Sequence, residues 1–285
     1  MVTIIDGTTK LSAKQIRFNE IFTVERVLSS RGFSIKTEGT GEDTVLGKPN
    51  WTHSEANTVF NIFDNVEYRN ELLDYIEGRL DRANVSSTTN ELITINGFKN
   101  DRQCFSTTYE WYIGELLVRK FMAFSSSYGV TLNNICRNSD DGTSGDFDVL
   151  SVLGDMNLIY LECKSGETKQ KSIRNTLERS ISLHCTASIF IRQDINENGL
   201  KQQMLFKHPM FDCTGNVVKL SIKNAQDSTI YKWFNCYFVD VASGDVENKL
   251  RTVLRTIEAS RVLINISTEP DDGDYKSLGY DFDRL

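Results

Sequence analysis

The chain has 285 residues, which is enough for one large domain or two domains of ordinary size. Its hydrophobic content of 39% and charged content of 25% are typical of a globular protein and argue against large-scale disorder. The net charge of −7 argues against a protein that coats nucleic acid by bulk electrostatics. Residues 269–285 hold six acids and two bases, so the rest of the chain is nearly balanced and leaves room for a local basic groove.

Residues 1–100 are expected to form a mainly helical region. Ser12 and Gln15 have capping-box spacing, and apolar residues at helical spacing follow them until Gly32, which predicts one helix. The later elements expected here are a loop at 37–50, a helix from Ser54, a helix with the stripe Tyr68, Leu72, Ile76 and Leu80, a loop at 84–90 and a strand at 92–95. No DNA-reading signature is evident, so sensing, substrate binding or assembly are the roles considered.

Residues 101–285 are expected to form a mixed sheet flanked by helices, followed by an acidic tail. A long, largely buried helix is predicted at 107–125, then a strand near Ile135 and a turn at 138–145. Two apolar runs, 147–153 and 158–164, are separated by the turn sequence GDMN and predict a β-hairpin. The later elements are helices at 169–183 and 245–259 and strands at 187–191, 217–222, 230–239 and 261–267. This order predicts the α/β (α+β) fold class.

The chemical signal of the sequence lies in this hairpin. Side chains alternate along residues 158–164, so Tyr160, Glu162 and Lys164 project to one face. Two adjacent charges in an otherwise apolar strand are costly to bury unless they are paired or bound to a metal. Asp148 lies near the start of the partner strand, and the hairpin is expected to bring it alongside Glu162. Two carboxylates and one ammonium group therefore converge.

This combination of groups suits the hydrolysis of a phosphodiester bond. Mg²⁺ prefers oxygen ligands and typically uses one or two carboxylates, which leaves positions for water and for a substrate phosphate. Such a metal, Mg²⁺ or Mn²⁺, lowers the pKa of bound water and neutralises the charge that grows during the reaction. Lys164 could position that water or stabilise the oxyanion.

The pattern Asp148-x13-Glu162-x-Lys164 resembles the core of the PD-(D/E)XK, or restriction-endonuclease-like, nuclease superfamily. GDFDVL followed by an apolar strand that ends in ECKSG is similar to the form seen in Mrr-type restriction enzymes and related effector and repair nucleases. The resemblance covers roughly residues 107–192. It implies a restriction-endonuclease-like mixed sheet, a nuclease domain over 101–285, and a role in restriction, antiviral defence or a mobile element.

The resemblance also implies roles for individual residues. Asp148 and Glu162 are expected to bind Mg²⁺ or Mn²⁺, with the backbone carbonyl of Cys163 as a further ligand. Lys164 takes the catalytic role. The expected activity is that of a metal-dependent endonuclease acting on DNA rather than RNA.

A further acid is expected from the helix upstream of the motif. Glu115, in GELLV, resembles the glutamate that this family often places there, so it is preferred as an additional catalytic and metal-binding residue. Glu110 lies on another apolar stripe of the same helix, and periodicity does not choose between the two. Asp146, two residues before Asp148, is either an extra ligand or a turn residue, and the turn is preferred.

Other charged groups have less specific interpretations. Four basic residues decorate the helix after the motif and either contact phosphates or form a solvated face: Lys169, Lys171, Arg174 and Arg179. The three histidines are isolated, so structural or surface roles are expected for His53, His184 and His208. The acidic tail is expected to be solvated, and an alternative is that it mimics nucleic acid and shields the cleft.

The sequence also suggests a cellular location and a set of partners. No apolar run approaches the ~18 residues needed to span a bilayer, and the N-terminus lacks the charged and apolar regions of a secretory signal. Six scattered cysteines without a CxxC pair are typical of reduced thiols. We therefore expect a cytoplasmic protein with no membrane partner. The resemblance implies DNA as a partner, and it leaves a homodimer or a partner protein open. The rival interpretation is a non-catalytic nucleic-acid-binding or assembly subunit with a nuclease-like fold.

Overall fold

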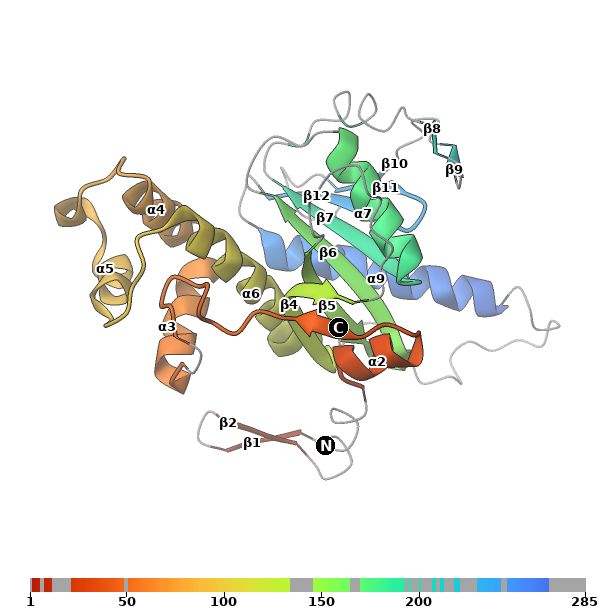
Figure 1. Cartoon of the computed structure of the whole chain (residues 1–285), viewed down its shortest axis with the longest axis horizontal. Coiled ribbons are helices and arrows are strands. Elements are labelled where there is room, and N and C mark those ends of the chain that lie inside the picture. The colour runs from red at the N-terminus through yellow and green to blue at the C-terminus, as the bar shows by residue number, and fades with distance from the viewer. Residues whose placement is uncertain are drawn as a thin grey trace.

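A computed structural model describes the chain at residues 2–5, 8–11, 22–48, 51–133, 146–164, 170–192, 195, 200, 207–208, 211–212, 218–220, 230–241 and 245–266. Within these residues a central sheet is covered by helices on both faces (Figure 1). This confirms the predicted mixed sheet flanked by helices. The restriction-endonuclease-like identity of the fold stays a resemblance.

The central sheet has eight strands in the order β10-β11-β12-β7-β6-β5-β4-β3. The pairs β6–β7 and β7–β12 are parallel, and the other neighbours are antiparallel. The strands are β3 (Ile35–Thr37), β4 (Ser125–Leu132), β5 (Phe147–Leu153), β6 (Asn157–Lys164), β7 (Ala187–Arg192), β10 (Val218–Leu220), β11 (Ile230–Trp233) and β12 (Cys236–Asp240). Two small hairpins lie outside this sheet: β1 (Val2–Ile5) with β2 (Thr8–Leu11), and β8 (Lys207–His208) with β9 (Phe211–Asp212).

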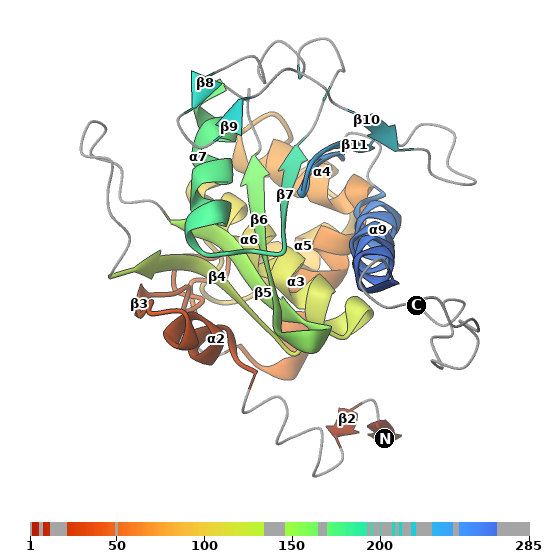
Figure 2. The ribbon, with the colours of Figure 1, turned by 90° about the vertical axis from the view of Figure 1, so that its right-hand side faces the viewer.

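The α-helices of the described residues divide between the two faces. They are α2 (Val24–Ser30), α3 (His53–Asp64), α4 (Val66–Ile76), α5 (Ser87–Thr94), α6 (Arg102–Phe121), α7 (Gln170–Ser182) and α9 (Val246–Ile266). Helices α6 and α9 share one apolar cluster with one face of the sheet. Helices α7 and α2 belong to two other clusters, which contain the strand residues that point to the opposite face. Figure 2 shows α7 to the left of β6 and β7 and α9 to their right.

The central strands are apolar almost throughout because both of their faces are covered. Val149 and Leu161 pack into the cluster that contains α6, whereas Leu150 and Tyr160 pack into the cluster that contains α2. The register pairs Val149 with Leu161 and Leu150 with Tyr160, so each cross-strand pair faces one layer. A charged side chain on either strand is therefore placed in a buried setting.

The N-terminal helices begin at recognisable capping residues. Thr52 and Glu55 form a reciprocal capping box at the start of α3, and Asn65 caps α4 with its side-chain oxygen. The helix predicted to end at Gly32 ends at Ser30, and Gly32 has the positive φ of 87° typical of a helix stop. Its expected start at Ser12 lies outside the described residues.

Several predicted elements were wrong in type or extent. The loop at 84–90 and the strand at 92–95 are largely replaced by α5, whose start is capped by Ser86. A short apolar run does not distinguish helix from strand, and here the cap decides. The single strand expected at 230–239 is the hairpin β11–β12, which turns at Phe234 with a φ of 49°. The strand expected at 261–267 belongs to α9, which continues to Ile266.

The strand expected near Ile135 lies earlier than predicted. Helix α6 ends at Phe121, Met122 adopts the left-handed conformation, and β4 begins at Ser125. The chain therefore reverses onto the sheet before the predicted helix end. Ile135 and the turn expected at 138–145 lie outside the described residues.

One apolar cluster crosses the expected boundary at residue 100. It contains Phe60 and Leu72 from the N-terminal helices together with Leu117 of α6 and Leu161 of the sheet. Helices α3, α4 and α5 lie beyond α6 on the side away from the sheet (Figure 1). The division into 1–100 and 101–285 as functional units stays a prediction. None of the described helices has both the length and the apolar character needed to cross a membrane.

Candidate active site

Two buried carboxylates and one lysine meet where β5 begins and β6 ends. Asp148 and Glu162 are 7% and 3% exposed. Lys164 Nζ lies 2.5 Å from Glu162 Oε1 and 3.5 Å from Asp148 Oδ2. The sequence predicted this convergence from strand alternation and the hairpin, and the structure brings these three residues together.

The backbone of the hairpin fixes the position of Asp148. Val149 and Leu161 form the last register pair at this end of the hairpin. Beyond them the N–H of Cys163 donates a hydrogen bond of 2.8 Å to Asp148 Oδ2. The Asp148 carboxylate thus accepts the hydrogen bond that a backbone carbonyl of β5 would otherwise accept from Cys163. This bond restricts the Asp148 side chain to a position beside Glu162.

Arg179 of α7 supports the other oxygen of Glu162. Its Nη1 lies 3.6 Å from Glu162 Oε2 and donates to Tyr160 Oη at 3.2 Å and to the carbonyl of Asp146 at 2.9 Å. Its guanidinium lies 5.7 Å from the ring centroid of Phe147. The hydroxyl of Tyr160 donates to Glu162 Oε2. Burial, followed by the charge of Glu162, raises the pKa of Tyr160, so this phenol keeps its proton and acts as a donor.

Burial and neighbouring charges shift the pKa values of Asp148 and Lys164. Burial, and then the charge of Glu162, raises the pKa of Asp148 to about 7 from an ordinary value of 3.8, although Lys164 works in the other direction. Burial alone would lower the pKa of Lys164, but the two carboxylates raise it. Lys164 is therefore a fixed ammonium group, while burial disfavours the ionised form of Asp148.

The preference for Glu115 as the upstream acid is corrected by its position. Glu115 Oε2 lies 2.7 Å from Arg119 Nε, one turn further along α6. Arg119 in turn donates to Asn57 and lies over the ring of Phe60, both on α3. Glu115 is thus held on the side of α6 that faces the N-terminal helices, away from Asp148 and Glu162.

Glu110 is the glutamate of α6 whose charge interacts with the carboxylates of the site. Burial, followed by the charge of Asp148, raises its pKa to about 9, with Lys164 opposing the shift. A β-carbon on Gly114, one turn later on the same face, would lie 2.9 Å from Ser126 Oγ on β4, so this face of α6 packs closely on the sheet. Glu115 lies about 140° around the helix from Glu110, which is why only one of them reaches the strand ends.

Asp146 acts through its backbone. Its side chain is exposed, and its carbonyl accepts the hydrogen bond from Arg179. The preferred interpretation of Asp146 as a turn residue stays a prediction, because the expected turn at 138–145 lies outside the described residues. Arg179 was interpreted as either a phosphate contact or part of a solvated helix face, and the structure instead buries much of it against Glu162 and Phe147.

Arg192 is a further cation that the sequence interpretation missed. It ends β7 and is in register with Lys164 on the neighbouring parallel strand. Its Nε is buried and has no hydrogen-bond partner among the described residues. The signal available in the sequence was a charged residue at the end of an apolar strand next to the ECK strand.

The other sequence candidates lie elsewhere or outside the described part. Arg174 pairs with Glu178 at 2.9 Å on the exposed side of α7. His53 is exposed and contacts Asn57 on its own helix, and His184 follows α7. Lys169 and the tail 269–285 lie outside the described residues. Cys104, Cys163, Cys185 and Cys236 are free thiols.

The donor set of the site fits a hard divalent cation. Mg²⁺ and Mn²⁺ favour oxygen ligands, and Mg²⁺ needs only one or two carboxylates from the protein. Asp148 and Glu162 supply these as neighbouring buried carboxylates on either side of the Lys164 ammonium group. Within the described ranges, no group of three or more His, Cys, Asp or Glu side chains is arranged to hold a metal. The carbonyl of Cys163 as a third ligand stays a prediction.

Comparison with known proteins does not assign this chain to a family. No protein-family model matches it, and no protein of curated function matches it. The functional argument therefore depends on the side chains at the ends of β5, β6 and β7 and on the part of α6 that faces them.

Proposed function

We propose that this chain is a Mg²⁺- or Mn²⁺-dependent endonuclease that hydrolyses phosphodiester bonds, with DNA as its expected substrate. The observation that carries the proposal is the buried pair Asp148 and Glu162 bridged by Lys164. Buried charges that are not fully balanced destabilise a fold, and such clusters concentrate at functional sites. A role in restriction or antiviral defence is what the resemblance of the motif suggests.

The residues of the site have separable tasks in this proposal. Asp148 and Glu162 hold the metal, which when bound supplies Lewis-acid activation of water and of the phosphate. Lys164 places a permanent positive charge beside both carboxylates, where it stabilises charge that develops on the phosphate oxygens. Its raised pKa fits this electrostatic task and does not fit a general base.

Two arginines extend the site on the face of the sheet that carries Lys164. Arg179 and Tyr160 restrain Glu162 Oε2, so the other carboxylate oxygen stays near Lys164. Arg192 ends the strand next to Lys164 and has an unused buried donor. An arginine in this place suits contact with a substrate phosphate, because its planar donors match phosphate oxygens.

The test is a cleavage assay on plasmid, single-stranded DNA and RNA with Mg²⁺, Mn²⁺ or a chelator. Glu162→Gln keeps the shape of the side chain and removes its charge, and we expect it to lower the rate by at least ~10³-fold. Glu115→Gln on α6 is the matched control and should retain the rate. Full activity of Glu162→Gln, or cleavage that persists in chelator, would contradict the proposal. Metal-dependent binding without cleavage of any substrate would favour the non-catalytic subunit.

A further inference from the structure

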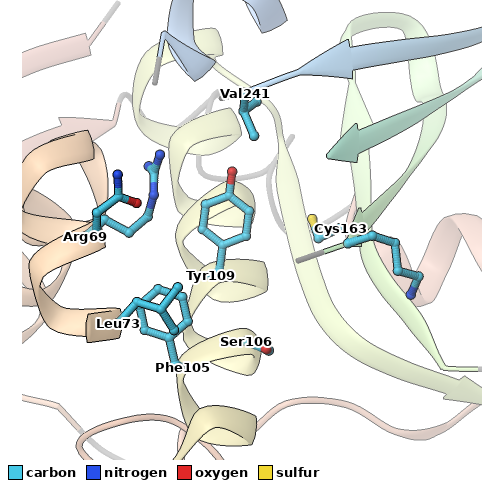
Figure 3. A pocket seen from close by; sticks show the side chains of 9 residues that line it. Arg69, Leu73, Phe105, Ser106, Tyr109, Cys163 and Val241 are labelled. Atoms are coloured by element: carbon cyan, nitrogen blue, oxygen red, sulfur yellow. The ribbon is translucent and has the colours of Figure 1, made fainter. Parts of the chain in front are cut away.

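A small pocket lies directly beside the candidate active site, between the N-terminal helices and the sheet. It holds about 60 Å³ of free space. Arg69 from α4, Tyr109 and Ser106 from α6, and Cys163 and Lys164 from the end of β6 are among its lining residues. Figure 3 shows the Arg69 guanidinium near the hydroxyl end of Tyr109, with Cys163 across the pocket from them. Lys164 thus belongs both to the pocket and to the catalytic cluster.

Arg69 is a buried cation with an unused donor. It is 3% exposed, and its Nη1 donates to the carbonyl of Phe63 at 2.7 Å. Its Nη2 is buried without a hydrogen-bond partner, and within the described part of the chain Arg69 forms no ion pair. A guanidinium in this state is costly to bury, so the site is incomplete without an anion.

Tyr109 contributes a second unused polar group. Its hydroxyl is buried and has no hydrogen-bond partner among the residues that the structure describes. Burial raises the pKa of Tyr109 to about 12, which keeps this hydroxyl protonated and able to donate. The guanidinium of Arg69 lies 5.3 Å from the centroid of the Tyr109 ring, so the two unused donors share one end of the pocket.

The size and the walls of the pocket restrict its ligand. Pockets for drug-sized molecules and cofactors are several times larger, about 300 Å³ or more, so a whole nucleotide does not fit. Apolar walls from Leu73, Phe105 and Val241 lower the local dielectric constant and strengthen an ionic contact inside. A compact anion with several acceptor oxygens, such as a phosphate group, meets all of these conditions.

We propose that this pocket binds the phosphate of the nucleic-acid strand that neighbours the scissile phosphate, through Arg69 and Tyr109. The inference rests on the proposed nuclease function for the identity of the strand. Lys164 lines the pocket and also lies beside both carboxylates, so a strand whose scissile phosphate is at Lys164 passes the pocket with its neighbouring phosphate. The N-terminal helical region, through α4, thereby becomes part of the substrate site.

The first test measures binding of inorganic phosphate to the metal-free full chain by calorimetry, at constant ionic strength with chloride as the reference. Tyr109→Phe removes only the hydroxyl and should weaken phosphate binding by about 3- to 10-fold. It should leave the melting temperature unchanged or higher, because the lost hydroxyl has no hydrogen-bond partner among the described residues. Arg69→Lys keeps a charge and a donor toward Phe63, and it should weaken binding at least as much as Tyr109→Phe.

The matched control is Tyr75→Phe, which removes a tyrosine hydroxyl on α4 that does not line the pocket. It should bind phosphate as the wild type does. Equal phosphate affinity of wild type and Tyr109→Phe, or no phosphate binding by the wild type, would overturn the pocket proposal.

The second test uses cleavage of an oligonucleotide with one neutral methylphosphonate next to the cut. The wild type should show a raised KM on this substrate, and Tyr109→Phe should show a smaller further rise, because both changes remove the same contact. If the chain cleaves nothing but binds phosphate through Tyr109, the nuclease proposal fails and an anion site remains. If it cleaves and neither change alters KM, the pocket proposal alone fails.

Discussion

The pKa values of two carboxyl groups in the N-terminal helices are lowered, whereas those of carboxyl groups near the strand ends are raised. Hydrogen bonds from Lys48 and Thr52 lower the pKa of Glu55 to about 2. The pKa of Glu71 is also lowered, because hydrogen bonds from Ser86 and Thr89 outweigh the effect of its burial. Each of these acids stabilises the fold in its ionised form by satisfying donors at the start of a helix.

The strand ends show the reverse. Burial raises the pKa of Asp148 to about 7 and that of Glu110 to about 9, and the charge of a neighbouring carboxylate adds to both shifts. These acids destabilise the fold when they ionise, because they are buried and, unlike Glu55, interact with other acids. Carboxylates that complete helix ends serve stability, whereas carboxylates gathered against one another at the sheet are retained at a cost in stability. This difference distinguishes acids that stabilise helix ends from the acids that we propose to be functional.

The largest expected change in activity tests the distinction between the two glutamates of α6. Glu110→Gln should lower the cleavage rate by about 10²-fold, since its carboxyl interacts electrostatically with Asp148, whereas Glu115→Gln should leave the rate within about 2-fold of the wild type. Steady-state rates with saturating Mg²⁺ provide the measurement. The reverse order of effects would restore Glu115 as the upstream acid and remove the distinction drawn here.

The next effect concerns stability as a function of pH. A carboxyl with a raised folded-state pKa costs no stability below its unfolded value of 3.8, and the cost grows as the pH rises toward about 7. Asp148→Asn should therefore be more stable than the wild type at pH 8, by on the order of 1–2 kcal/mol, and equal to it near pH 3.5. Urea unfolding at both pH values measures this difference.

Metal provides the control for that experiment. Mg²⁺ should raise the melting temperature of the wild type at pH 8, because a bound cation offsets the carboxylate charge, and it should raise that of Asp148→Asn much less. A variant that is less stable than the wild type at pH 8 would show that Asp148 stabilises the fold in its ionised form.

The smallest expected effect tests the other half of the comparison. Thr52→Ala removes the cap of α3 and should destabilise the fold by about 1 kcal/mol at neutral pH without changing the rate of cleavage per folded molecule. Thermal unfolding and the cleavage assay are measured on the same sample. Loss of activity at unchanged stability would mean that α3 takes part in the reaction.

The core of the candidate site was predictable from the sequence because it is local. Glu162 and Lys164 share a strand face by alternation alone, and a short turn brings Asp148 alongside them. Arg179 was identified only as a basic residue of the next helix, because its contact with Glu162 depends on how α7 crosses the sheet. Such contacts follow from packing angles, which periodicity does not provide.

The sequence pattern did not distinguish Glu110 from Glu115 for a related reason. Helix α6 is buried on more than one side, so both glutamates lie on apolar stripes and the pattern does not mark the side that meets the sheet. Gly114 was the available signal, because the residue without a side chain marks where two backbones approach most closely. The secondary-structure prediction was wrong where a short apolar run was compatible with both a helix and a strand, as in α5.

Gly114 also determines how closely α6 can approach the sheet. With no β-carbon, it lets α6 rest against the side chains of Ser126 and Val149, one turn after Glu110. A methyl group at this position would meet Ser126 Oγ at 2.9 Å, so the serine side chain would have to rotate or the helix would have to move. The fit of α6 on the sheet thus depends on an atom that the protein leaves out.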